Sequence, residues 1–288
     1  MSEELAVVSR IEQKTRSIDT ISITARLKQL LNGLGSWVQG LPLVFVFFAV
    51  WETLPRLGVI DPLFLPTFSA TISTLIDLTL SGKMLLHIAA SLQRAVIGFS
   101  LALLVAVPLG FLMGWYNKFE RYTDLLVQGL RNTSTFALLP IFLLFLGLGE
   151  ASKIAIIFYG ASWQLLMNTI SGVKSVDPIY IKAAKSMGVS DRDLFRKIIL
   201  PASIPSIVIG ARLGAKIALM VVIAAEMIGA KSGLGFFIQN AQFNFMVPEM
   251  YAGILTLALL GLAVNYLLVW FEKKTTYWKG EVGSGILG

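Results

Sequence analysis

Long apolar runs follow one another along this chain from residue 41 onward, separated by short polar segments. Each run approaches or exceeds the roughly 20 residues that a helix needs to cross a bilayer. The pattern predicts an all-α, polytopic membrane protein with six transmembrane helices. The predicted spans are Leu41–Gly58, Ala89–Trp115, Leu125–Leu148, Lys153–Val173, Pro201–Ile228 and Pro248–Phe271.

The polar stretches around these runs predict the remaining organisation. Residues 1–40 read as a cytoplasmic N-terminal segment, residues 41–271 as the membrane domain, and residues 272–288 as a polar tail. Between the first two spans, Asp61–Pro66 predicts a loop bracketed by proline, and Thr67–Ile88 predicts a surface helix.

Composition supports the membrane class and excludes several kinds of chemistry. Hydrophobic residues make up 56% of the chain and charged residues 14%, against about a quarter charged in soluble domains. There is no cysteine and one histidine, His87, which excludes a disulfide framework and a histidine or cysteine metal cluster. No phosphate-binding G-x-x-x-x-G-K-[ST] loop is present, so we do not expect an ATPase. The sequence also has no H-E-x-x-H motif and no cysteine nucleophile, so we do not expect another enzyme. Serine–lysine chemistry through Lys216 stays formally open.

The distribution of positive charge predicts the orientation of the spans. Of the 24 Lys and Arg residues, 16 fall in the two tails and in segments 116–122 and 172–200, whereas four fall in the opposite loops. Because Lys and Arg gather on the cytoplasmic side, both termini and the polar segment 174–200 are predicted to be cytoplasmic. The net charge of +7 thus indicates orientation in a cytoplasmic (inner) membrane rather than nucleic-acid binding.

The polar segment 174–200 carries signals for a helix–turn–helix elbow. "IYIKAAKSM" is a good helix former, and Gly188 can end that helix in the left-handed conformation. Ser190 is placed as the N-cap of a second short helix, "DRDLFRKIIL", with Asp193 three residues on. Pro201 is expected to start the next span. Spacing alone leaves two interpretations, a solvated amphipathic loop or a docking element for a cytosolic partner.

One spaced pattern in this segment is specific. Ala183 and Ala184 are followed by Gly188 after three residues, then by Ile198 and by Leu200–Pro201. This pattern resembles the "EAA" loop of binding-protein-dependent ABC importer permeases, in which it is the coupling helix that sits in a groove of the ATPase subunit. The leading Glu of that family is Lys182 here. "IDPLFLP", "LLPIFLLFLGLGEASKI" and "AAEMIGAKSGLGFFI" are also similar to the taurine, alkanesulfonate and nitrate permeases of this family.

The resemblance implies a type I (MetI-like) permease that forms a pathway with a second permease, most simply as a homodimer. It also implies two cytosolic ATPase subunits that bind ATP and Mg, an extracytoplasmic solute-binding protein, and no cofactor on this chain. The bilayer is a further partner, and nucleic acid is not expected. Residues carried over to ATPase coupling are Lys182, Ala183, Ala184, Met187, Gly188, Leu194, Phe195, Leu200 and Pro201.

Charged and polar residues inside predicted spans are the candidates for the translocation pathway. Arg212 lies about 17 Å along its helix from Pro201, and Lys216 is one turn further on the same side. They either line a pathway for an anion or form internal pairs. Glu226 is placed near the outer end of that span. Arg131, Asn132, Thr133, Ser134 and Thr135 form a second candidate, because a helix broken at membrane depth often borders a substrate pathway.

A small anionic solute is therefore the expected cargo, a sulfonate such as taurine first. Anions of the nitrate or bicarbonate type, and a thiamine-precursor-like or aromatic solute, are the alternatives. A secondary transporter is a remote alternative, because the chain shows no internal repeat and few intramembrane acids.

Overall fold

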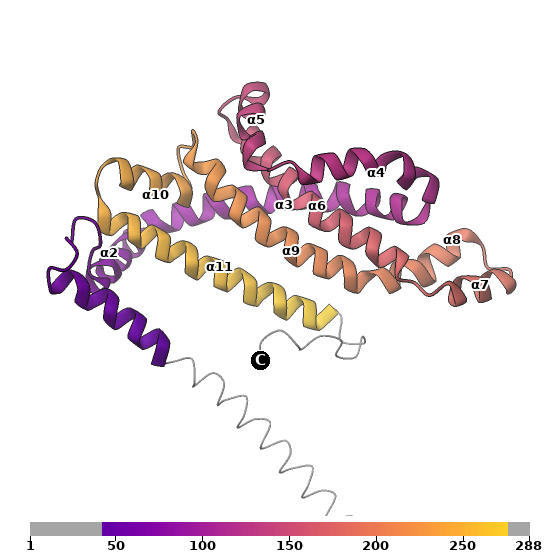
Figure 1. Ribbon diagram of the computed structural model, residues 1–288, viewed down its shortest axis with the longest axis horizontal. Coiled ribbons are helices and arrows are strands. Elements are labelled where there is room, and N and C mark those ends of the chain that lie inside the picture. Colours follow the sequence, from indigo (N-terminus) through magenta and orange to yellow (C-terminus); the bar gives the residue numbers. More distant parts are fainter. Residues whose placement is uncertain (1–41, 276–288) are drawn as a thin grey trace, which may run out of the picture. The chain divides into compact units, whose positions relative to one another are not determined.

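The computed structural model describes residues 42–275, and every regular element within that range is a helix (Figure 1). The predicted N-terminal segment 1–40 and residues 276–288 of the predicted tail lie outside the described residues. The chain divides into two units, Met1–Ser69 and Ala70–Gly288, each of which is considered by itself.

The described part of the first unit consists mainly of one helix and the loop that follows it. Residues 42–56 are helical, so the predicted start of the first span at Leu41 falls outside the described part. The predicted loop at Asp61–Pro66 is present, and the indole Nε1 of Trp51 donates to the carbonyl oxygen of Pro66 at 3.0 Å. The backbone N–H of Ser69 donates to Glu52 at 2.9 Å, which holds the end of the loop against the helix.

The predicted surface helix at Thr67–Ile88 is corrected by the structure. Helix α2 (Phe68–Leu80) ends at a turn in which Gly82 takes a φ of 76°, a conformation that glycine adopts without strain. Helix α3 (Lys83–Trp115) starts immediately after it, so Lys83 and His87 belong to the long helix rather than to the surface helix.

Helices α3, α6 (Glu150–Lys174) and α9 (Leu200–Met227) lie side by side and form the core of the second unit (Figure 1). Small residues bring their backbones together, as expected for the glycines of α3. A Cβ atom placed on Gly110 would lie 2.6 Å from Cβ of Thr169, so only glycine allows this approach. Ile157, Leu165 and Val222 are completely buried between the three helices.

Within residues 42–275, four helical segments are long and apolar enough to cross a membrane: 83–115, 150–174, 191–227 and 247–275. The third predicted span, Leu125–Leu148, is not a continuous helix. Helix α4 (Asn117–Asn132) meets the segment formed by η1 (Phe136–Leu138) and α5 (Leu139–Leu146) at 86°, and this bent pair counts as a fifth span if both helices belong to one crossing. The bend occurs where Thr133 takes an extended conformation.

The fifth predicted span also differs from expectation at its start. Helix α8 (Asp191–Leu194), the π-helical turn η2 (Phe195–Ile199) and α9 run on as one helical segment, so Pro201 lies within it rather than at its beginning. Proline lacks the N–H of the α-helical ladder, and the wider π turn is a way to accommodate such a defect. Helices α10 (Leu234–Phe243) and α11 (Val247–Thr275) complete the second unit, and α11 contains the sixth predicted span.

Candidate functional site

Residues 177–199 form the expected elbow, here taken as α7 (Pro178–Ser186), the turn after it, α8 and η2. Asp177 caps α7, because its Oδ1 accepts the backbone N–H of Ile179 at 2.8 Å. Gly188 has a φ of 73°, and Ser190 Oγ accepts the N–H of Asp193 at 3.3 Å. The predicted glycine stop and serine cap are thus confirmed, whereas the cap at Asp177 was not predicted.

One side of the elbow is attached firmly to the bundle. Ala184 and Leu194 are buried in a cluster with Val173, which lies near the end of α6. The ring of Phe195 meets Phe111 edge-on, with 5.2 Å between the ring centroids. These apolar contacts therefore couple any motion of the elbow to the bundle.

The other side of α7 presents an apolar ridge, defined here as Ile179, Tyr180, Ala183 and Met187. Positions 179, 183 and 187 are spaced by four, which places them on one face of the helix. Ile179, Tyr180 and Met187 are 68%, 66% and 75% exposed. A contiguous exposed apolar patch on an otherwise polar element marks an interaction surface.

The structure thus divides the predicted coupling residues into two groups. Lys182, Ala183, Met187, Gly188 and Pro201 are exposed, whereas Ala184, Leu194, Phe195 and Leu200 are buried or half-buried. Ile179 and Tyr180 were missed by the sequence analysis, although their spacing to Met187 was a signal for them.

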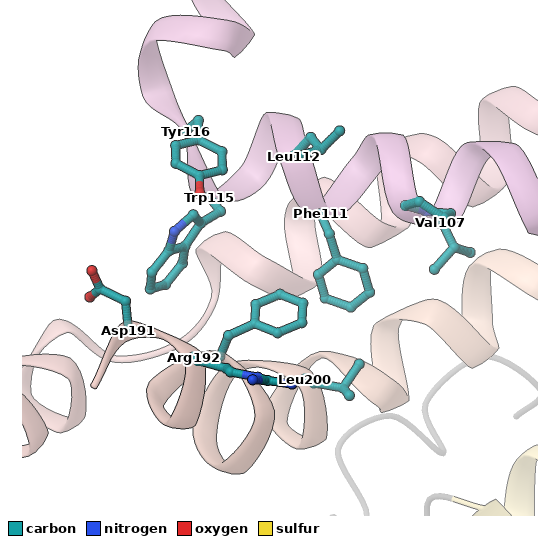
Figure 2. Close-up of a pocket in the computed structure, with 10 residues that line it drawn as sticks. Val107, Phe111, Leu112, Trp115, Tyr116, Asp191, Arg192 and Leu200 are labelled. Carbon is teal, nitrogen blue, oxygen red and sulfur yellow. The ribbon is translucent and has the colours of Figure 1, made fainter. Parts of the chain in front are cut away.

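Two hollows flank the elbow. Figure 2 shows the larger one, a cavity of about 650 Å³ between the last turns of α3 and the start of α8, with Phe111, Trp115 and Arg192 around it. A second cavity of about 510 Å³ lies among the ends of α3 and α6 and the elbow, and it includes Lys174 and Lys185. Trp115 and Asp191 line both cavities.

The polar run 131–135 sits at the bend between α4 and η1, as the sequence analysis anticipated for a broken helix. Arg131, Asn132, Thr133 and Ser134 are exposed, and Thr135 is half-buried. The Tyr159 hydroxyl donates to the carbonyl oxygen of Leu130 at 2.5 Å, so α6 holds the last turn of α4 in place.

The two cations proposed for the pathway differ in their surroundings. Arg212 forms an ion pair with Glu272 of α11, with 2.7 Å between Nη1 and Oε2. Lys216 is exposed and has no ion pair or hydrogen bond with any residue in the described range 42–275. The sequence suggested the same role for both, and only the tertiary structure separates them.

A buried polar network ties the helices together at the end of the bundle opposite the elbow. We call Ser91, Arg94, Glu150, Glu226 and Ser232 the arginine cluster. The guanidinium of Arg94 donates to Glu226 at 2.7 Å, to Glu150 at 2.5 and 2.9 Å, and to the carbonyl and hydroxyl oxygens of Ser232. All five N–H groups of the arginine are therefore engaged.

Glu226 lies at the centre of this cluster and is completely buried. Besides Arg94, it accepts hydrogen bonds from Ser91 Oγ at 2.8 Å and from the backbone N–H of Gly235 at 3.0 Å. A Cβ atom on Gly233 would overlap the Glu226 carboxylate. In this structure Glu226 therefore has no surface available to a solute, although the sequence analysis placed it in the pathway.

Within residues 42–275, no group of three or more His, Cys, Asp or Glu side chains could hold a metal ion. Lys153, the first residue of the fourth predicted span, is a buried residue of α6. Its ammonium group donates to the carbonyl oxygens of Leu148 and Gly149, each at 2.9 Å.

Comparison with known proteins bears on both the fold and the site. A family model described as "Binding-protein-dependent transport system inner membrane component" matches residues 106–277, a range that includes the elbow. The chain is 33% identical to a putative aliphatic sulfonates transport permease protein of Bacillus subtilis over 85% of this chain and 89% of that protein. It is 32% identical to the taurine transport system permease protein of Escherichia coli over 82% of this chain and 88% of the relative.

A solved structure of the MetNI methionine ABC transporter, in an inward facing conformation, has a similar fold. The similarity has a TM-score of 0.57 at 17% sequence identity, and it covers 68% of this chain and 98% of that one.

Proposed function

This chain belongs to the family of binding-protein-dependent transport system inner membrane components, and on that premise we propose that it forms the translocation pathway of an ATP-driven importer for a small anionic solute. It is a permease subunit and not itself the ATPase. The observation that carries the proposal is the elbow, whose coupling pattern is built as a capped element with an exposed apolar ridge.

We assign the elbow to the cytoplasmic side, together with both termini. The excess of Lys and Arg in the elbow, the tails and segment 116–122 supports this orientation. The arginine cluster then lies at the outer end of the bundle, and the solute enters from that side.

The partners follow from the same premise. Two cytosolic ATPase subunits bind ATP and Mg, and each docks on the apolar ridge of one permease. A second permease, most simply another copy of this chain, completes the pathway, and a solute-binding protein delivers cargo to the outer face. The exposed ridge supports the first of these assignments, because its side chains have no cover within the described part of the second unit.

The coupling route runs from the elbow into two core helices. Motion of α7 reaches α8 through the buried cluster that contains Ala184 and Leu194, and it continues into α9 because residues 191–227 are one helical segment. It reaches α3 through the contact between Phe195 and Phe111. Closure of the ATPase pair upon ATP binding would thus tilt α3 and α9 as a unit and turn the cavity between the permeases outward, and hydrolysis would reset it. The bend at 131–135 is the point at which α4 and α5 can move against this unit.

We place a sulfonate such as taurine first among the solutes, because the relatives that transport sulfonates and taurine match four-fifths or more of this chain. Nitrate- or bicarbonate-type anions and a thiamine-precursor-like or aromatic solute are the alternatives. The test is uptake of labelled taurine in cells that lack this chain, with and without the chain restored, in competition with alkanesulfonates, nitrate and an aromatic acid.

Restored uptake that depends on ATP and is blocked by sulfonates would support the proposal. A chain that reaches the membrane but never co-purifies with an ATPase would contradict the permease assignment and favour a secondary transporter. Uptake of another solute with the ATPase bound would change only the cargo.

Met187→Asp is expected to reduce ATP-coupled uptake about tenfold or more, because a carboxylate would be desolvated in the centre of an apolar contact. The fold should tolerate the change, since Met187 is 75% exposed. Lys185→Asp is the matched control: it also introduces an acid, but on the opposite face of α7. The measurement is uptake together with the amount of ATPase retained on the purified permease. Equal loss in both variants would argue against a role specific to the ridge.

A further inference from the structure

Three cations of the long helical segments, Arg94, Lys153 and Arg212, have polar partners within the chain. Arg94 lies between two carboxylates, and Lys153 donates to two backbone carbonyls. Arg212 is paired with Glu272. Lys216 stands apart, because in the described range 42–275 it is exposed and has neither an ion-pair nor a hydrogen-bond partner.

The position of Lys216 makes this exposure significant. It lies about 24 Å along α9 from Leu200, in the interior of a helix that spans the membrane. A lysine at such a depth that faced lipid would be unfavourable by about 2.5–3.5 kcal/mol or more. A side chain in this place therefore has to face water, an anion or another protein chain.

The face of α9 that carries Lys216 is open in the single chain. The helix packs against α6 through Gly210 and Gly214, which lie on the opposite side. Leu213 and Met220, the neighbours of Lys216 one turn away, are 39% and 64% exposed. Arg212, also one turn from Lys216, is paired with Glu272, so Lys216 is the unpaired charge on this part of α9 among the described residues. An unpaired charge suits the wall of an aqueous pathway better than a lipid contact.

We propose that Lys216 is the residue that binds the anionic group of the transported solute, and that Arg212 serves as a structural ion pair with Glu272. This assignment rests on the proposed function, because the pathway is completed by a second copy of the chain. Twofold symmetry would then bring two Lys216 side chains to opposite walls of one pathway, where together they attract a small anion.

The chemistry of lysine defines the class of solute. An ammonium group is a compact point charge without the planar fork of arginine, so it attracts sulfonate, carboxylate or nitrate without selecting among their geometries. Lys216 would accordingly determine that the cargo is an anion, while the residues around it determine which anion. A solute without an anionic group would gain nothing from this residue.

The first test compares Lys216→Met with Lys216→Arg in the complete transporter in cells, with labelled taurine and nitrate as probes. Loss of the charge-assisted contact should lower uptake of the anion at subsaturating concentration about tenfold or more in Lys216→Met, and Lys216→Arg should retain most of it. If the side chain acted only through packing, its charge would not matter, and Lys216→Arg would not retain more uptake than Lys216→Met.

The absence of cysteine from the chain allows a sharper test by chemical rescue. Lys216→Cys should react with the water-soluble reagent aminoethyl methanethiosulfonate. The cysteine thiolate displaces methanesulfinate from the reagent, and the product is a mixed disulfide that carries an ammonium group. This product resembles lysine, so uptake of the anion should return, and taurine should slow the labelling. Ala218→Cys is the matched control, because Ala218 is only 1% exposed and should stay unlabelled.

Anion uptake at the wild-type rate in Lys216→Met, or a labelled Lys216→Cys that regains no uptake, would overturn the assignment. If Lys216→Met fails to accumulate, the labelling and rescue of Lys216→Cys decide the question. Wild-type uptake restricted to a solute without an anionic group would also overturn it and would leave the permease assignment intact. Failure of the chain to co-purify with an ATPase would instead overturn the proposed function itself.

Discussion

Replacement of Arg94 by leucine is expected to destabilise the folded chain by about 3–5 kcal/mol, the range for removal of one partner from a buried ion pair. Glu226, which has no exposed surface, would be left as an uncompensated charge at the end of the bundle opposite the elbow. Neither Ser91 nor the N–H of Gly235 carries a charge that could replace the guanidinium. The change should lower the thermal midpoint of the detergent-purified protein and the amount that accumulates in the membrane.

Two companion variants make this prediction specific to the cluster. Glu150→Gln should have a much smaller effect, because the Glu150 side chain is 58% exposed and water can compensate for its charge. The double variant Arg94→Leu with Glu226→Leu should be more stable than Arg94→Leu alone, since no isolated charge remains. A double variant that is no better than the single one would show that the lone carboxylate is not the cause.

Gly188→Trp is expected to abolish ATP-coupled transport while the chain still inserts into the membrane. The glycine has a φ of 73°, and a side chain there would point into open space, with no atom within 4 Å of an added Cβ. The tryptophan would therefore not clash within the chain, and its bulk would lie beside the apolar ridge, the proposed docking surface of the ATPase. The measurement is ATP-dependent uptake and ATPase retention by the purified permease.

Conformational strain and obstruction of docking can be separated at this position. Gly188→Asn keeps the left-handed conformation accessible and should retain most of the uptake, because asparagine tolerates it better than other residues with side chains. Gly188→Ala adds a strain of about 1–2 kcal/mol without bulk and should have an intermediate effect. Transport by Gly188→Trp at the level of Gly188→Asn would show that the elbow does not couple the permease to an ATPase.

Much of the elbow could be predicted from sequence because its signals are local. The stop at Gly188 and the cap at Ser190 depend on residues within one helical turn of each other, and both are present as expected. The same holds for the apolar runs that became α3, α6 and α11, since hydrophobic length alone determines whether a helix can span a bilayer.

The errors of the sequence analysis lie at helix ends and breaks. A proline at position 201 indicated a helix start, but the π turn before it keeps the helix continuous from Asp191. The polar run 131–135 indicated a break within the predicted span Leu125–Leu148, but not the bend of 86° that the chain makes there. In both places local propensity allows more than one backbone path, and packing selects between them.

By itself the sequence determined the class of molecule, the number and order of most apolar helices, and the local construction of the elbow. Only the tertiary structure decided which charges are free. Arg94 and Glu226 are 132 residues apart in sequence, and Arg212 and Glu272 are 60 apart, so no local pattern pairs them. Lys216 lies one turn from Arg212, yet it forms no ion pair with any acidic side chain of the described residues, because ion pairing depends on which side chains meet in space.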